Sequence, residues 1–142
     1  MTKVVHVQMT LDRANAVAKA LDLSGRIMMG QMKEITNYVR FGEVPVKDDS
    51  ASNGSRVATK DEVQAIESHI KAICDILGST QGTVGIGSRN LPIDAKRQYE
   101  VQKAIQKVLA DKRKPGGITV DHDGVTVRYT QDPEPIAQIR EI

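Results

Sequence analysis

Cysteine, aromatic residues and long apolar runs are all scarce in this chain of 142 residues. Its one cysteine, Cys74, cannot form a disulfide within the chain, and no residues around it complete a zinc-binding pattern. Tryptophan is absent and aromatic residues make up 3% of the sequence, which removes the large stacking surfaces of many single-strand nucleic-acid binders. We therefore expect a reducing, cytoplasmic environment and a core of aliphatic and methionine side chains.

The chain also lacks a hydrophobic segment of the roughly 20 residues that a membrane-spanning helix needs. Its first residues, MTKVVHVQMTLDR, lack the apolar stretch and the cleavage site of an export signal. The formal net charge of +2 is too small to indicate a nucleic-acid or membrane partner by itself. With 39% hydrophobic and 27% charged residues, the composition predicts one folded domain over residues 1–142.

The first forty residues predict a strand and two helices. Alternating side chains in residues 3–10, KVVHVQMT, are typical of a strand with one buried face. Residues 11–23 have apolar side chains at helical spacing, and the Ser-Gly pair that follows predicts the end of that helix. Gly30 indicates either a close backbone approach or a later start for the second helix, drawn over residues 26–40. That helix is predicted from a narrow apolar seam: Met28, Met32, Ile35 and Val39.

The clearest predicted helix lies in the middle of the chain, after a flexible loop over about residues 45–58 that carries a run of Asp, Ser, Asn and Gly. Thr59 and Glu62 form a capping box at its start, and Gly78 is a typical C-terminal stop. Its apolar residues repeat at spacings of three and four: Val63, Ile66, Ile70, Ile73 and Leu77. Such a seam pairs with another helix, either within the chain or across a dimer.

The last third predicts a basic helix and a β-hairpin. Asn90 is a candidate cap and Pro92 suits a first helical turn, so a helix is expected from there to just before Pro115. Asp123-Gly124, between alternating apolar runs in residues 118–129, predicts a two-residue hairpin turn. The expected fold class is α+β, with heptad-like helix seams packed with a small antiparallel sheet that includes this C-terminal β-hairpin. Cationic residues gather on the basic helix or just beyond it: Lys96, Arg97, Lys103, Lys107, Lys112, Arg113 and Lys114.

The stretch GIGSRNLP, residues 85–92, allows two interpretations. A dinucleotide fingerprint needs a third glycine where Asn90 stands, so that motif is excluded. A glycine-rich turn leading into a helix can hold an anion at the free amides of the helix start, with Arg89 and Arg97 nearby. It can also be only a turn followed by a cap, which the residues alone favour.

The sequence shows no catalytic or metal-binding constellation. His6, His69 and His122 do not stand at metal-ligand spacing, and Cys74 has no neighbouring base. We therefore expect a protein that is not an enzyme and that carries no cofactor and no metal.

The last third of the chain resembles a phage protein family. A Gly/Asn-rich turn, a proline, an alanine, a basic residue and an aromatic residue open its long helix, at Gly87, Asn90, Pro92, Ala95, Arg97 and Tyr99. In this pattern the chain is similar to the first described type of phage Thoeris anti-defence sponge. The resemblance implies a non-enzymatic protein in the host-cell cytoplasm that sequesters cyclic ADP-ribose isomers, and in some members cyclic oligonucleotides. It also implies a homo-oligomer, either a dimer or a trimer of dimers, with no membrane partner.

The resemblance and the basic helix together suggest which residues bind the ligand. Phosphate binding or base stacking is expected from six residues in the last third: Arg89, Asn90, Arg97, Tyr99, Lys103 and Arg128. The second, cyclic-oligonucleotide site that some members hold near the amino-terminal helices would use Arg26 and Met28.

A second function fits the same basic helix. The chain can be a small phage or prophage regulator that binds nucleic acid or a protein partner through this helix. A duplex binder loses affinity steeply as salt rises, whereas an enclosed small-molecule pocket depends on salt less.

Overall fold

The computed structural model describes residues 2–78, 85–113, 129–133 and 135–141. The chain divides into two compact units. The first unit joins the two ends of the sequence, Met1–Gly25 and Arg89–Ile142. The second unit is continuous and comprises Arg26–Ser88.

Helix α1 (Leu11–Met28), which belongs to the first unit up to Gly25, begins directly after a capping threonine. The Thr10 hydroxyl accepts a hydrogen bond from the Arg13 amide at 3.3 Å, which satisfies one free donor of the first turn. Before this cap, residues 2–10 form no strand and their side chains are exposed. The strand predicted over 3–10 is therefore wrong. Alternation gives a strand only where a neighbour completes the backbone hydrogen bonds, and no described residue does so here.

Helix α1 is also longer than predicted, because Ser24 and Gly25 lie inside it. A glycine weakens a helix but does not end it while the following turn keeps its hydrogen bonds. The end comes at Gly30, whose φ of 80° is left-handed. The Gln31 amide donates to the Arg26 carbonyl at 2.8 Å, as in a Schellman end. The second helix consequently does not start at residue 26, and the later start is confirmed.

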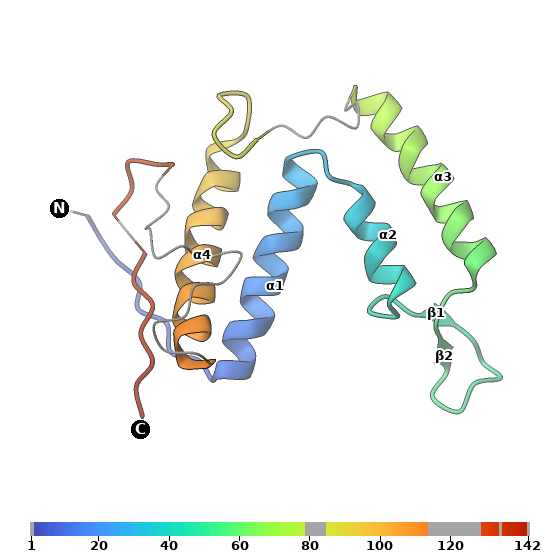
Figure 1. Ribbon diagram of the computed structural model, residues 1–142, viewed down its shortest axis with the longest axis horizontal. Coiled ribbons are helices and arrows are strands. Elements are labelled where there is room, and N and C mark those ends of the chain that lie inside the picture. The colour runs from blue at the N-terminus through green and yellow to red at the C-terminus, as the bar shows by residue number, and fades with distance from the viewer. Residues whose placement is uncertain (1, 79–84, 114–128, 134, 142) are drawn as a thin grey trace. The chain divides into compact units, whose positions relative to one another are not determined.

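Helix α4 (Ile93–Arg113) runs beside α1 in the opposite direction (Figure 1). The Gln102 side-chain amide donates to the Asp22 carboxylate of α1 at 3.0 Å. The helix begins just after Pro92, so this proline precedes the first turn. Its buried residues include two polar ones, which an apolar pattern does not predict: Ala95, Glu100, Gln102, Leu109 and Ala110.

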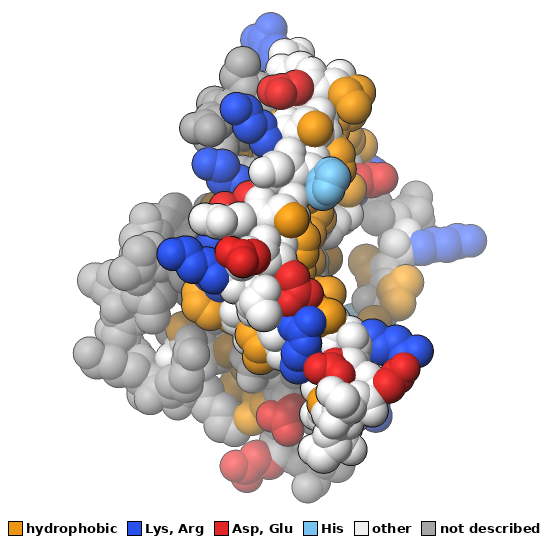
Figure 2. All heavy atoms as spheres, turned by 90° about the vertical axis from the view of Figure 1, so that its right-hand side faces the viewer, with side chains coloured by type: hydrophobic (Ala, Val, Ile, Leu, Met, Phe, Trp, Pro, Cys, Tyr) orange, Lys and Arg blue, Asp and Glu red, His pale blue; other side chains and the backbone are white. Residues whose placement is uncertain are grey.

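The second unit is a pair of helices of unequal length. Helix α2 (Lys33–Arg40) packs against α3 (Lys60–Leu77). Their buried apolar residues are Val39, Val63 and Ile70. Helix α2 has eight residues and spans about 12 Å, whereas α3 has eighteen and spans about 27 Å. The apolar seam of α3 is therefore too long for α2 to cover. Figure 2 shows hydrophobic side chains along α3, and those of its last turns are exposed: Ile73, Ile76 and Leu77.

A short antiparallel sheet connects the two helices. It pairs β1 (Val46–Lys47) with β2 (Ser55–Arg56), with Val46 opposite Arg56 and Lys47 opposite Ser55. The Asp48 carboxylate accepts hydrogen bonds from the amide and the hydroxyl of Ser50, at 3.0 and 2.6 Å. The segment predicted as a loop over 45–58 thus contains a small sheet, and its flexibility stays a prediction.

The start of α3 confirms the predicted capping box. The Thr59 hydroxyl accepts from the Glu62 amide, and the Glu62 carboxylate accepts from the Thr59 amide, both at 3.2 Å. The same carboxylate accepts from Arg56 at 2.7 and 3.3 Å, which ties β2 to α3. These hydrogen bonds, with that from Arg56 first, lower the pKa of Glu62 to about 2. At the other end, Gly78 has a φ of 66°, as the predicted helix stop requires.

The described residues therefore form four helices and one two-stranded antiparallel sheet, which lies in mid-chain. The predicted C-terminal hairpin over 118–129 lies outside the described residues except for Tyr129, which is not in a strand. The prediction of a single domain over 1–142 stays a prediction. None of the helices in the described ranges combines the length and the apolar character that crossing a bilayer requires.

Candidate functional site

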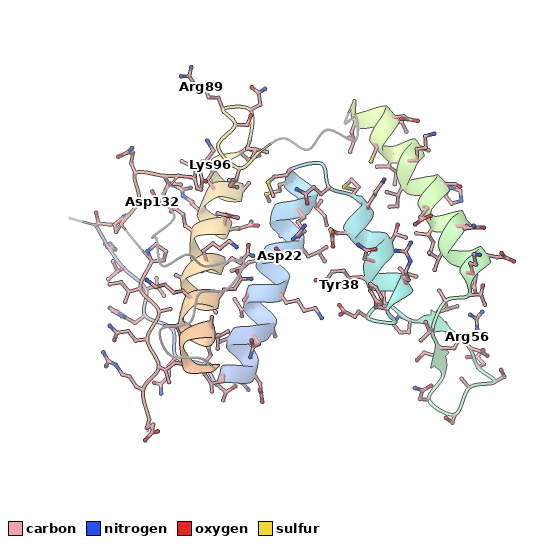
Figure 3. The ribbon with its side chains drawn as sticks, in the orientation of Figure 1. Asp22, Tyr38, Arg56, Arg89, Lys96 and Asp132 are labelled. Atoms are coloured by element: carbon pink, nitrogen blue, oxygen red, sulfur yellow. The ribbon has the colours of Figure 1, made fainter. Side chains whose placement is uncertain are left out.

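The turn before α4 and the first turn of that helix each contribute a cation. The Ser88 amide donates to the Gly85 carbonyl at 2.9 Å, so this amide already serves a turn and is not free to bind phosphate. Arg89 follows that turn and points away from α4, and Lys96 lies near the start of the helix (Figure 3). Neither side chain forms an ion pair within the described part of the chain, so both charges remain available to an anionic ligand.

Arg97, by contrast, is held by two carboxylates. Its Nε donates to Asp132 at 2.6 Å, and its Nη1 donates to Asp94 at 3.0 Å. These bonds, with that to Asp132 first, raise the pKa of the Arg97 guanidinium above its ordinary value. An anionic ligand at Arg97 must therefore compete with both carboxylates.

Glu100, one helical turn after Arg97, is a buried carboxylate with 3% of its surface exposed. Its Oε1 accepts hydrogen bonds from the backbone amides of Tyr129 and Thr130, the latter at 2.7 Å. Its Oε2 accepts from the Thr130 hydroxyl at 2.8 Å. The burial of this charge is thus compensated by three donors from one short segment, residues 129–130.

The two tyrosines of this unit meet beside Glu100. The rings of Tyr99 and Tyr129 pack edge to face, with centroids 5.8 Å apart and planes at 73°. The ammonium of Lys103 lies 5.3 Å from the centroid of the Tyr99 ring. Tyr129 is 42% exposed, so a flat group can still reach part of its ring. We call Tyr99 and Tyr129 the tyrosine pair.

The structure brings together three of the predicted ligand-binding residues. Lys103 contacts Tyr99, and Arg97 binds the segment that carries Tyr129. Arg89 and Asn90 are exposed in the turn that precedes α4. The predicted Arg128 lies outside the described residues.

The remaining two predicted ligand-binding residues belong to the second unit, at the end of α1. Arg26 donates to the Gln31 side chain at 3.1 Å and lies 3.7 Å from the Glu34 carboxylate. Met28 is exposed. Their predicted role in a second ligand site stays a prediction.

Sequence reasoning missed the residues that join α4 to the C-terminal segment. Glu100 and Asp132 were not singled out, because their partners lie 29 to 35 positions away in the sequence. One signal was present: Asp94 and Arg97 stand three positions apart on a helix, a spacing at which opposite charges pair.

The described residues contain no group of three or more His, Cys, Asp or Glu side chains that can hold a metal ion. No family model, curated protein or solved structure matches this chain. Function must therefore be argued from the residues around the tyrosine pair.

Proposed function

We propose that this protein binds and sequesters a phosphorylated cyclic nucleotide at the start of α4, without turning it over. In this proposal the ligand is a cyclic ADP-ribose isomer or a related cyclic oligonucleotide. The setting is the host cytoplasm, where the protein acts as a phage anti-defence sponge of the kind that the last third of the sequence resembles.

The observation that carries the proposal is the tyrosine pair with Lys103 beside it. Lys96, Tyr99 and Lys103 stand at helical spacings of three and four, so they lie along one stripe of α4. A base can stack on the exposed part of Tyr129, while the lysines attract phosphate. Arg89 adds a further charge that no described residue neutralises.

The proposal includes a homo-oligomer, either a dimer or a trimer of dimers. It is supported by the seam of α3, which continues past the reach of α2 and leaves its members Ile73 and Leu77 40% and 66% exposed. A second copy of the same chain supplies an equally apolar partner for these side chains. The predicted C-terminal hairpin with Arg128 also remains part of the proposal.

Isothermal titration with cyclic ADP-ribose tests the proposal. We expect saturable binding, and we expect the intact ligand to be recovered when the protein is denatured. Lys96→Glu should weaken binding by about tenfold, roughly 1.4 kcal/mol, because it places a negative charge beside the phosphates.

The matched control is Lys71→Glu, which makes the same charge change at an exposed position on α3 and should leave affinity unchanged. Absence of binding at millimolar ligand removes the sponge function. Recovery of a cleaved product makes the protein an enzyme. Binding to duplex DNA that weakens steeply with salt supports the regulator instead.

A further inference from the structure

Among the described residues, Arg97 and Glu100 of α4 both bind the C-terminal segment, and their contacts differ in character. The ion pair between Arg97 and Asp132 is half exposed on both sides, so water competes with it. The contact of Glu100 is buried and uses both backbone amides of residues 129–130 and the Thr130 hydroxyl. A buried carboxylate that lost these donors would be strongly disfavoured, so the Glu100 contact decides where the segment lies.

This contact also fixes the tyrosine pair. Glu100 is the neighbour of Tyr99 on α4, and it holds Tyr129 through that residue's own backbone amide. The backbones that carry the two rings are therefore joined through one side chain. The ring contact itself is a weak interaction that two free surface tyrosines would rarely maintain.

We propose that Glu100 is a positioning residue for the nucleotide site. It touches no ligand, and it holds the ring of Tyr129 against Tyr99 so that a base finds a preformed stacking surface. Preformed surfaces bind more tightly because less conformational freedom is lost on binding. This inference rests on the proposed function for its ligand, whereas the anchoring of Tyr129 can be tested without any ligand.

Three variants separate anchoring from general stability. Glu100→Ala removes the acceptor. Glu100→Gln keeps the shape, because its amide oxygen can accept from both backbone amides and its NH₂ can donate to the Thr130 hydroxyl oxygen. Thr130→Val removes the hydroxyl, which donates to Glu100 and also accepts from the Asp132 amide at 3.3 Å, and it keeps both backbone amides. Glu100→Ala should therefore weaken the anchoring of Tyr129 most, and the other two variants should weaken it much less.

Fluorine NMR of protein labelled with 3-fluorotyrosine reads out the effect on each ring. The chain has three tyrosines, and Tyr38 on α2 lies in the second unit, so its signal reports whether that unit is intact. In Glu100→Ala we expect the signals of the tyrosine pair to move to the positions of exposed tyrosine while the Tyr38 signal stays. Hydrogen exchange at the Thr130 amide should become faster by about tenfold or more, as expected for a lost charge-assisted bond.

Titration with cyclic ADP-ribose completes the experiment. Affinity should fall by about tenfold or more in Glu100→Ala and should largely return in Glu100→Gln, which a merely destabilised fold would not show. Unchanged tyrosine signals and unchanged exchange in Glu100→Ala would overturn the anchoring role. Loss of the ring contact with unchanged affinity would overturn the positioning role. If the wild-type protein binds no ligand, the proposed function fails with its ligand, and the NMR measurements still decide whether Glu100 anchors Tyr129.

Discussion

The carboxylate of Glu62 has two partners. It caps the first turn of α3 through Thr59 and binds the guanidinium of Arg56 from β2. Both partners favour the ionised form, which is why the pKa of this half-buried carboxyl group lies at about 2 instead of its ordinary 4.5. Stability of the sheet-to-helix junction is therefore linked to pH.

The sign follows from the direction of that shift. A lowered carboxyl pKa contributes stability that is complete above pH 4.5 and is lost as the pH falls towards 2. In Arg56→Ala, which removes the largest cause, the midpoint of Glu62 should rise towards 4.5. NMR titration of the Glu62 carboxyl carbon measures both midpoints. A wild-type midpoint near 4.5 would contradict the assignment.

Replacing Gly78 or Gly25 by alanine should change the free energy of unfolding in opposite directions. Gly78 ends α3 with a φ of 66°, so Gly78→Ala should destabilise by about 1 kcal/mol through backbone strain alone. Gly25 lies inside α1, and a Cβ there would meet no heavy atom within 4 Å. Gly25→Ala should therefore stabilise the protein by roughly 0.5–1 kcal/mol. Urea unfolding of the two variants measures the difference, and equal signs would refute it.

At the scale of elements, α1 and α4 are joined by a polar contact within their buried face. Gln102 is 3% exposed and donates to Asp22, so Gln102→Ala should destabilise by about 1–3 kcal/mol. The adjacent Val101 is 38% exposed, and Val101→Ala should cost less than about 1 kcal/mol. Chemical denaturation of both variants tests this order, and a larger loss in Val101→Ala would reverse our assignment of the faces.

The elements also show what sequence could supply. Helix α3 was predicted at both ends, because the capping box and Gly78 are local signals. The division between α1 and α2 was misplaced, because the Ser-Gly pair is a weak stop and the left-handed Gly30 a strong one. The strand over 3–10 failed because alternation specifies a strand only together with a partner.

The same distinction applies to the site. Arg97, Tyr99 and Lys103 were predicted from one helix, where neighbours in space are neighbours in sequence. The carboxylates of Glu100 and Asp132 could not be predicted, because they depend on which distant segment returns to α4. Glu100 in particular carries no sequence sign of burial, since a glutamate on a charged helix is normally solvated.

At the scale of the whole molecule, the exposed end of the α3 seam predicts self-association. We expect the wild-type protein to sediment as a dimer or larger, and Ile73→Glu combined with Leu77→Glu to sediment as a monomer of 15.5 kDa. Both side chains are exposed in a single chain, so the variant should still fold.

Ile136→Glu is the matched control for this experiment. Ile136 is 81% exposed, more than either seam residue, but it lies in the C-terminal segment, so its replacement should leave the sedimentation of the wild type unchanged. A wild-type monomer at high concentration would refute self-association through α3.

The first unit is assembled from both ends of the chain, with the second unit inserted between them. During synthesis, the hydrogen bond between Asp22 and Gln102 can form only after a further 80 residues have been added. Arg40 and Glu67 of the second unit, by contrast, are 27 positions apart. At ribosomal speeds that delay is about 4 to 16 seconds. The helices of the second unit can fold on the ribosome before α4 has been synthesised. During that time the face of α1 that packs against α4 is exposed, and we expect a nascent-chain chaperone to bind there.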